Sequence, residues 1–269
     1  MQVDAGRFTV RLANTEDEVR AAQRLRYRVF VEEMGASVSP EDGAQRIERD
    51  RFDPYFDHLL LIDNECADRD ALLGVVGVYR LMRGASARRG IGFYGDGEYD
   101  LSRLYDFDGE TLELGRSCVD AAYRGGSGMH LLWTGLGRYV DEYKIAILFG
   151  VASFHGTDTA NLAQALSYLH HNHLAPADLR VRALDRAFAA MDLLQPGEVD
   201  KAEALRQIPA LIKAYIRLGG FVGEGAFVDR EFNTVDVCLI MDTERMVQRY
   251  RKFYQRHTRG ERAAAGDAP

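Results

Sequence analysis

The sequence predicts a mixed α/β fold, and three observations support this prediction. Segments with the apolar pattern of strands are interleaved with segments whose apolar residues recur at helical spacing. One strand candidate, residues 111–119, leads through a glycine-rich turn at 123–128 into an amphipathic helix at 129–144. The nearly continuous apolar run at 145–154 has the composition of a strand that is covered on both faces. We therefore expect a central sheet flanked by helices.

The strands are predicted from runs of apolar and β-branched residues that are bounded by polar or glycine-containing turns. They occupy residues 8–12, 58–63, 72–81, 111–119, 145–154, 221–228 and 235–241. Helices are predicted at 129–144, at 158–171, and from a cap at Asn14 or Thr15 to Gly35. The order of strands and helices supports one α/β layout.

Several segments lie outside this regular pattern. The polar residues 36–56 show little periodicity and are predicted to form a long charged loop. The segment 83–100, rich in glycine and arginine, is expected to be mobile in part. Residues 176–217 are expected to form a helical insertion. Because no repeat or linker interrupts the chain, we predict a single domain over residues 1–250, followed by a basic, partly disordered tail at 251–269.

The composition excludes several classes of protein. Of 269 residues, 46% are hydrophobic, and 34 lysines and arginines against 41 aspartates and glutamates give a formal net charge of −7. This composition excludes a disordered chain, and the acidic balance disfavours binding to nucleic acid. Cys66, Cys118 and Cys238 form no CxxC pair, which favours a reducing compartment over a disulfide scaffold or structural zinc. With no secretory signal and no apolar run of transmembrane length, we expect a cytoplasmic protein.

The strand at 111–119 carries two charged residues that are unusual in a core strand, Glu113 and Arg116. Side chains three positions apart point to opposite faces of a regular strand. Gly115 lies between them and favours a β-bulge, which would bring both groups to one side. A bulge also exposes backbone N–H groups near Gly115–Ser117 that can donate to an oxyanion. A site is one interpretation; the other is a buried Glu–Arg pair that only holds neighbouring loops.

The turn after this strand, YRGGSG, is a candidate binding loop for a phosphate group or a pantetheine chain. Successive N–H groups at a helix N-terminus cradle phosphate or a pantetheine chain, and glycines allow a close approach. The turn matches neither the GxGxxG nor the P-loop pattern, so dinucleotide or NTP binding is not favoured. The residues of this turn that are predicted to bind such a group are Arg124, Gly125, Gly126, Ser127 and Gly128.

A third cluster combines Asp50 and Asp53 of the sequence DRFD with Arg80 of the strand VVGVYRL. The two carboxylates are candidates to anchor a cationic substrate or to orient the arginines; a solvated loop is the alternative. The histidines of HHNH lie at a predicted helix end with no carboxylate at ligand spacing, so no metal site is predicted.

The layout resembles the GNAT acyltransferase fold, in which a bulged central strand and the glycine turn after it hold the pantetheine arm of an acyl thioester. The resemblance implies a mixed, mostly antiparallel sheet. Acyl-homoserine-lactone synthases of this superfamily share a set of residues that fits here in order and spacing: Arg26, Phe30, Asp50, Asp53, Arg80, Glu113 and Arg116. Those synthases usually carry tryptophan at the position that is Ala36 here, which argues against lactone synthesis.

The chain more closely resembles the L-ornithine N-alpha-acyltransferases of bacterial ornithine-lipid synthesis. The matching segments run through nearly the whole chain, and the most specific are ELGRSCV, LFGVASFHGTD and LIKAYIRLGG with DREFNT. The resemblance implies transfer of a 3-hydroxyacyl group from acyl carrier protein to the α-amine of L-ornithine, giving lyso-ornithine lipid. It implies no cofactor besides the thioester on the phosphopantetheine of the carrier protein.

The resemblance also implies roles for the site residues. Glu113 would take the proton of the amine, directly or through a water, because a protonated amine is not a nucleophile. Arg116, or less readily Arg80, would hold the carboxylate of the amino acid. Asp50 and Asp53 would attract the ammonium of its side chain or fix those arginines. The remaining residues expected to bind substrate are Arg26, Phe30 and Ser117.

In the glycine turn, Ser127 and Met129 occupy the two small positions of the GNAT phosphate-loop pattern, which fits a donor without the CoA nucleotide.

Two basic segments suggest where partners bind. Carrier proteins are acidic, and an expected docking patch comprises Arg80, Arg83, Arg88 and Arg89. The product carries a fatty chain, so we expect peripheral contact with the inner face of the cytoplasmic membrane. The basic tail at 245–262 would rest on anionic lipid or be a solvated, frayed terminus.

Two alternatives stay open at this point. One is the same chemistry on another acceptor, such as glutamine, glycine or homoserine. The other is a non-catalytic module of this fold that binds acyl carrier protein or lipid. Both Glu113 and Arg116 are present, which favours an enzyme.

Overall fold

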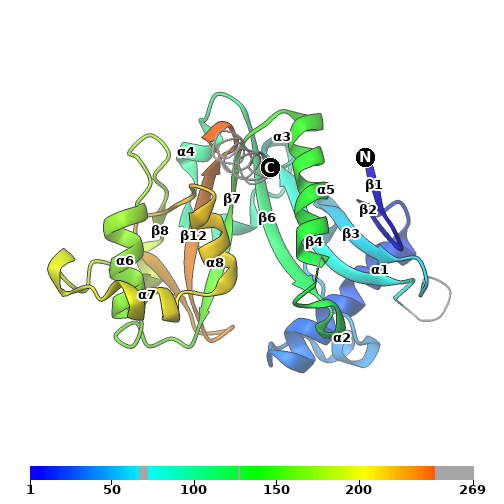
Figure 1. Ribbon diagram of the computed structural model, residues 1–269, viewed down its shortest axis with the longest axis horizontal. Coiled ribbons are helices and arrows are strands. Elements are labelled where there is room, and N and C mark those ends of the chain that lie inside the picture. The colour runs from blue at the N-terminus through cyan, green and yellow to red at the C-terminus, as the bar shows by residue number, and fades with distance from the viewer. Residues whose placement is uncertain (67–71, 127, 246–269) are drawn as a thin grey trace, which may run out of the picture. The chain divides into compact units, whose positions relative to one another are not determined.

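Figure 1 shows a computed structural model of the protein, which describes residues 1–66, 72–126 and 128–245. The chain forms two compact units. The amino-terminal unit comprises Met1–Gly97 and Phe107–Ile145, and the carboxy-terminal unit comprises Glu98–Asp106 and Ala146–Pro269. The single domain expected over residues 1–250 stays a prediction, and the tail expected at 251–269 lies outside the described residues.

The amino-terminal unit is built on an antiparallel sheet of consecutively paired strands. In spatial order these strands are β1 (Gln2–Ala5), β2 (Phe8–Leu12), β3 (Asp57–Asp63), β4 (Val75–Arg83) and β6 (Glu110–Val119). The sequence predicted four of them within a few residues. It missed β1, in which exposed polar residues alternate with half-buried apolar ones. The apolar side chains of β1 are short, those of Val3 and Ala5.

Helix α1 (Glu16–Arg26) covers one face of this sheet. The hydroxyl of Thr15 accepts the N–H of Glu18, which confirms the predicted cap. After Arg26 the chain continues as a π-helix, Tyr27–Glu33. The helical stretch therefore has about the predicted extent, but its second part has the i→i+5 hydrogen bonds of a π-helix. The apolar side of the helix packs with Leu60 and Val78 of the sheet.

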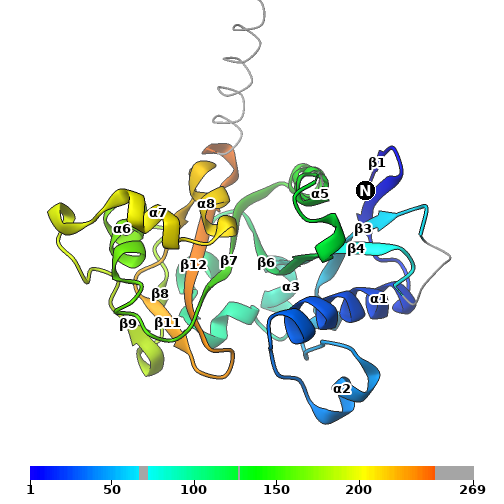
Figure 2. The same ribbon diagram turned by 60° about the horizontal axis from the view of Figure 1, so that its bottom comes forward.

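Helix α5 (Gly128–Tyr143) covers the opposite face, as Figure 2 shows. Leu59 and Leu60 are neighbours on β3 and therefore point to opposite faces; Leu60 packs with α1, and Leu59 lies beside Gly135 of α5. A Cβ atom at Gly135 would lie 2.4 Å from Val10 Cγ1, so the glycine is what allows the helix to approach the sheet.

Two segments without predicted regular structure contain helices. Within 36–56, α2 (Pro40–Gln45) forms because Ser39 accepts the N–H of Asp42 and a proline opens the first turn. Within 83–100, α3 (Gly84–Arg89) is followed by a 3₁₀ turn at Tyr94–Gly97. The prediction of a loop at 36–56 was therefore wrong for α2.

The strands of the carboxy-terminal unit also pair antiparallel: β12 pairs with β7, β11 and β10, and β11 pairs with β9. These strands are β7 (Ile145–His155), β9 (Phe188–Ala189), β10 (Phe221–Val222), β11 (Ala226–Asp229) and β12 (Thr234–Asp242). A separate pair joins β5 (Tyr99–Asp100) to β8 (Arg182–Ala183). The helices are α4 (Ser102–Tyr105), α6 (Ala163–His173), α7 (Lys201–Gln207) and α8 (Ala210–Arg217).

The helical insertion expected at 176–217 is α-helical only in its second part, where α7 and α8 lie. Its first part supplies the short strands β8 and β9. Across the described ranges, every helix is too short or too polar to cross a membrane.

Candidate active site

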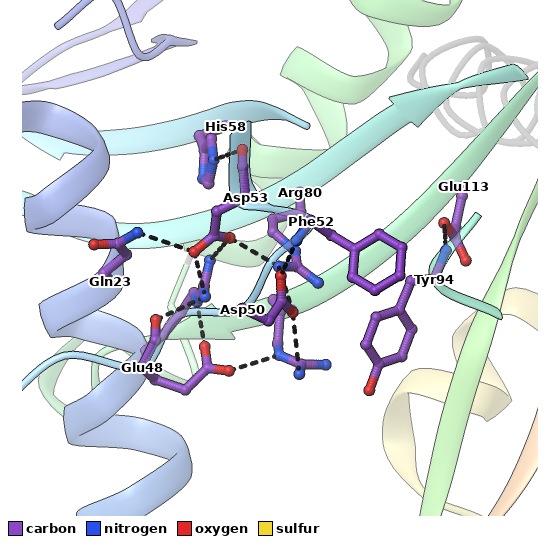
Figure 3. Close-up of polar contacts among 11 residues, drawn as sticks. Gln23, Glu48, Asp50, Phe52, Asp53, His58, Arg80, Tyr94 and Glu113 are labelled. Carbon is purple, nitrogen blue, oxygen red and sulfur yellow. Dashed lines mark hydrogen bonds and ion pairs between the residues drawn. The ribbon is translucent and has the colours of Figure 1, made fainter. Parts of the chain in front are cut away.

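Arg26, at the end of α1, is fully buried in the amino-terminal unit (0% exposed) and makes a two-point ion pair with Asp53. Its Nη1 and Nη2 atoms donate to the two carboxylate oxygens at 2.7 and 3.1 Å. Nε donates to the Glu48 carboxylate, and Nη2 also donates to the Glu48 carbonyl at 2.7 Å. The fork of one arginine therefore fixes the charged segment that follows α2, whose Glu48 and Asp53 side chains are labelled in Figure 3.

Arg80, on β4, is equally buried (1% exposed) and holds the same segment from the sheet side. Its Nη1 donates to both oxygens of Asp50, at 2.7 and 2.8 Å, and to Oδ1 of Asp53 at 2.8 Å. The guanidinium also lies over the Phe56 ring, 4.4 Å from its centroid. Because Arg80 is buried, its expected place in a surface docking patch for the carrier protein was wrong.

Arg116 completes the network from β6. Its Nε donates to Glu48 at 3.1 Å, and its Nη2 lies 3.5 Å from Asp50. Three arginines thus meet three carboxylates, and the described contacts of Asp50 and Asp53 are those expected of groups that fix the arginines. The Arg116 and Asp50 side chains are 18% and 19% exposed, more than the other four charged groups of the network.

The pKa values of the charged groups in this network are set by two opposing effects, burial and ion pairing. Burial alone would raise the pKa of Asp53 and Glu48, but their arginine partners outweigh burial and hold both pKa values below the usual range. Burial likewise opposes the charge of Arg26 and Arg116, and the nearby carboxylates still raise the pKa of both guanidinium groups. All four groups are therefore charged across the physiological range of pH.

The predicted bulge is present in β6, one residue later than its predicted centre. Gly115 stays paired with Arg80, and Cys118 with Val78, so Arg116 and Ser117 together lie opposite the single residue Tyr79. The residue with left-handed backbone is Arg116, at φ +49°, rather than the glycine. The bulge gives the Arg116 side chain its place beside Asp50, a carboxylate that also pairs with Arg80.

Glu113 lies three positions before Arg116, the first residue of the bulge, and is buried (2% exposed). Its two carboxylate oxygens accept the backbone N–H groups of Tyr94, at 2.8 Å, and of Gly95, at 2.6 Å. Burial raises the pKa of Glu113 to about 7, while these two N–H groups and the charge of Arg80 act to lower it. A carboxylate with a pKa near neutrality is suited to accept and return a proton.

The turn between β6 and α5 holds the predicted donor-binding residues. Arg124 donates through Nε to the Val119 carbonyl at 2.8 Å, and its Nη2 pairs with Glu33 of the π-helix at 2.7 Å. Gly125 adopts a positive φ of +79°, which favours glycine there. Gly126 follows Gly125, and Gly128 opens α5. Ser127, which was also predicted to bind the donor, lies outside the described residues.

Two predicted substrate residues lie apart from the ion network. Phe30, in the π-helix, packs against the buried core cluster around Leu25 and Val29. The Ser117 hydroxyl is buried within the bulge and has no hydrogen-bond partner among the described residues. The structure thus brings together Arg26, Asp50, Asp53, Arg80 and Arg116, with Glu113 joined to them through Tyr94.

Sequence reasoning missed Glu48, Tyr94 and Gln23. Glu48 pairs with two arginines, Tyr94 links Glu113 to Arg116, and the amide of Gln23 donates to Asp53 at 2.9 Å. The acidic spacing in ERDRFD was a signal for Glu48, since it places a third carboxylate in the segment that holds Asp50 and Asp53. Tyr94 carried no comparable signal.

Within the described ranges, one group of carboxylates is close enough to hold a metal ion. Glu98, Asp229 and Asp236, in the carboxy-terminal unit, bring one oxygen each within 4.8 Å of the others. Burial raises the pKa of Asp236 to about 6, and Thr234 donates to its Oδ2 at 3.0 Å. The negative charge of Asp229 also acts to raise the pKa of Asp236.

The bulged strand and the glycine turn that opens the next helix are the two features by which the sequence resembles GNAT acyltransferases, and the chain is an acyltransferase of this fold. Residues 25–134 match the family described as Acetyltransferase (GNAT) domain. A solved structure of FeeM, an N-acyl amino acid synthase from uncultured soil microbes, is similar in fold, with a TM-score of 0.51 and 14% identity over 90% of this chain and 94% of that one.

The chain belongs to the L-ornithine N(alpha)-acyltransferase family. It is 53% identical to the L-ornithine N(alpha)-acyltransferase of Rhodobacter capsulatus over 253 residues. These aligned residues cover 94% of this chain and 96% of that protein. It is 43% identical to the protein of the same name from Brucella abortus, over 93% of this chain and 89% of that protein. The GNAT fold and the family expected from the sequence are confirmed.

Proposed function

We propose that the enzyme transfers a 3-hydroxyacyl group from acyl carrier protein to the α-amine of L-ornithine, giving lyso-ornithine lipid. The observation that carries this proposal is the Glu113 carboxylate, which is buried, held by two N–H groups and given a pKa of about 7. The names of the relatives support ornithine as the acceptor.

In the proposed reaction, Glu113 takes a proton from the ammonium of the acceptor, directly or through a water. The neutral amine attacks the thioester carbonyl, and backbone N–H groups at the Arg116–Ser117 bulge stabilise the oxyanion that forms. The tetrahedral intermediate loses the second proton of its nitrogen to water and then collapses, so that the new C–N bond remains and the C–S bond breaks. The thiolate of the pantetheine leaves and receives the proton that Glu113 holds.

The acceptor would bind at the accessible end of the ion network. Once its α-amine is neutral, ornithine carries one carboxylate and one side-chain ammonium. Arg116 and Asp50 offer the complementary pair of charges, with 3.5 Å between Nη2 and Oδ2, and they are the most exposed members of the network. Arg116 would therefore hold the carboxylate and Asp50 the ammonium, while Arg26, Arg80 and Asp53 keep both in place.

The donor would bind at the turn that opens α5. The nearby guanidinium of Arg124 already has a carboxylate partner, Glu33, at 2.7 Å. A diphosphate would have to compete with that partner, whereas an uncharged pantetheine arm would not. This supports a carrier-protein donor over CoA, with Arg88 and Arg89 on α3 as exposed cations for an acidic partner. A lipid product would place the enzyme in the cytoplasm at the surface of the membrane.

The test offers the purified full-length chain 3-hydroxyacyl carrier protein or the matching acyl-CoA, with ornithine, lysine, glutamine, glycine and homoserine as acceptors. Mass spectrometry identifies the acylated products. We expect N-acyl-ornithine, formed faster from the carrier protein than from CoA. Product with another amine and none with ornithine would contradict the acceptor, and equal use of CoA would contradict the donor.

A further inference from the structure

The 3₁₀ turn at Tyr94–Gly97 holds the proposed base from one side. Consecutive N–H groups of Tyr94 and Gly95 each bind one oxygen of Glu113, at 2.8 and 2.6 Å. The N–H of Phe93 donates to the Asp96 carboxylate at 2.8 Å and closes the turn. The position of the Glu113 carboxylate therefore depends on the backbone of this turn.

The side chain of Tyr94 ties the same turn to the ion network. The Arg116 guanidinium lies over its ring, 4.9 Å from the centroid, and the Arg80 guanidinium lies 5.8 Å from it. The Phe52 ring meets the Tyr94 ring edge to face, with centroids 5.4 Å apart. Figure 3 shows Tyr94 between Glu113 and the charged cluster.

We propose that Tyr94 is a positioning residue whose ring, packed against Arg116 and Phe52, fixes the 94–97 turn so that its N–H groups hold Glu113 for proton transfer. The proposal rests on the proposed function, in which Glu113 is the base. In this proposal the orientation of the Glu113 carboxylate depends on Tyr94, because a strand position alone does not fix it. The base is aligned with the groups that bind the acceptor, although Tyr94 and Glu113 are 19 positions apart in the chain.

The test compares Y94F, which keeps the ring, with Y94L, which keeps an apolar side chain but removes the aromatic face. The first readout is the pKa of Glu113 in the full-length protein without substrates, from the carboxyl chemical shift of ¹³C-labelled glutamate assigned with E113Q. We expect Y94F, which keeps the ring but loses the hydroxyl that hydrogen-bonds with Arg116, to shift this pKa less than Y94L does. In Y94L the turn loosens, its N–H groups no longer lower the pKa of Glu113 as strongly, and this pKa rises by about one unit.

The second readout is kcat/KM at two values of pH. A rise of the Glu113 pKa from about 7 to about 8 lowers the basic fraction at pH 7 roughly fivefold. Y94L should therefore lose at least that factor at pH 7 and recover most of it at pH 9. A purely structural defect would lower the rate equally at both. Y55L, at an exposed tyrosine outside the network, is the matched control.

An unchanged Glu113 titration in Y94L, or an equal loss at both pH values, would overturn the proposal. If Y94L does not fold, F52L removes the edge contact from the Tyr94 ring and should shift the Glu113 pKa in the same direction by a smaller amount. No shift in F52L would count against the proposal in the same way. Normal turnover of E113Q would refute the base itself, an outcome that is separate from the titration of Glu113.

Discussion

Arg26 and Asp53 form a two-point ion pair in the interior of the amino-terminal unit, with N–O distances of 2.7 and 3.1 Å. The pair joins the end of α1 to the 3₁₀ turn that precedes β3. Oδ1 of the same carboxylate also accepts from Arg80 at 2.8 Å. One carboxylate thus connects a helix, a turn and a strand, and its charge compensates two buried guanidinium groups.

Removal of this charge is expected to destabilise the fold. D53N keeps the shape of the side chain but leaves Arg26 and Arg80 buried without a full counter-charge. We expect a loss of about 3–5 kcal/mol in the free energy of unfolding in urea at pH 7. D108N, at an exposed aspartate of the same unit, should change it by less than about 0.5 kcal/mol. Similar values for both variants would contradict the structural role of the ion pair.

Stability should depend on pH in two opposite ways. The folded pKa values of Asp53 and Glu48 are lowered, so their contribution is present above their unfolded pKa values, about 4, and is lost as the pH falls through the folded ones. The folded pKa of Glu113 is raised from 4.5 to about 7, so burial of Glu113 costs stability as the pH rises between these values.

Urea unfolding of the native protein, D53N and E113Q from pH 3 to pH 8 separates the two effects. D53N should flatten the acid limb, and E113Q should remove the decline toward neutrality. An acid limb of unchanged slope in D53N would show that Asp53 is not a source of it.

The activity should follow the ionisation of Glu113. We expect kcat/KM for the acceptor to rise with pH through about 7, and E113Q to lower it by about a hundredfold or more and to remove that limb. E110Q, on the same strand, is the matched control. Initial rates over a range of pH at saturating donor provide the measurement. Near-normal turnover of E113Q with both substrates saturating would exclude Glu113 as the base.

Asp50 should decide between acceptors with charged and neutral side chains. In D50N the side-chain ammonium of ornithine loses its proposed partner, so we expect KM for ornithine to rise by about tenfold or more. KM for glutamine, which has no such ammonium, should change far less. Competition between the two amino acids, read by mass spectrometry, measures the ratio directly. An equal loss for both would mean that Asp50 serves only to fix Arg80 and Arg116.

The exposed arginines of α3 should matter for the carrier protein and not for a small donor. Charge reversal in R88E/R89E should lower kcat/KM for acyl carrier protein by about tenfold at low salt and leave acyl-pantetheine unaffected. R20E, on the exposed surface of α1, is the control. Equal behaviour of R88E/R89E and R20E with the carrier protein would place the docking surface elsewhere.

The sheet could be predicted because its strands carry a local signal. In β3 and β4 the apolar residues are nearly continuous, and in β2 they alternate, so the period alone located them. The bulge was predicted from Gly115, yet the left-handed residue is Arg116. Glycine is permitted there but not required, because ion pairs with Glu48 and Asp50 compensate for the strained arginine backbone.

The parts of the site that could not be predicted from the sequence are those made by contacts between distant segments. Charge and low periodicity made residues 36–56 look like a solvated loop, whereas Glu48, Asp50 and Asp53 point inward to buried arginines. Composition cannot distinguish a solvated carboxylate from a paired one. Tyr94 acts through its backbone N–H and its ring face, and neither depends on a pattern in the neighbouring sequence.

The charges of the ion network cancel, since Arg26, Arg80 and Arg116 meet Glu48, Asp50 and Asp53. A neutral cluster projects little field into the solvent, so the proposed amino-acid acceptor would reach this site by ordinary diffusion and be recognised only on contact. The capture rate for the acceptor should therefore vary little with ionic strength. An acidic carrier drawn to Arg88 and Arg89 would instead arrive more slowly as salt is added. The two substrates of one reaction would then respond differently to the same change in the cell's ionic medium.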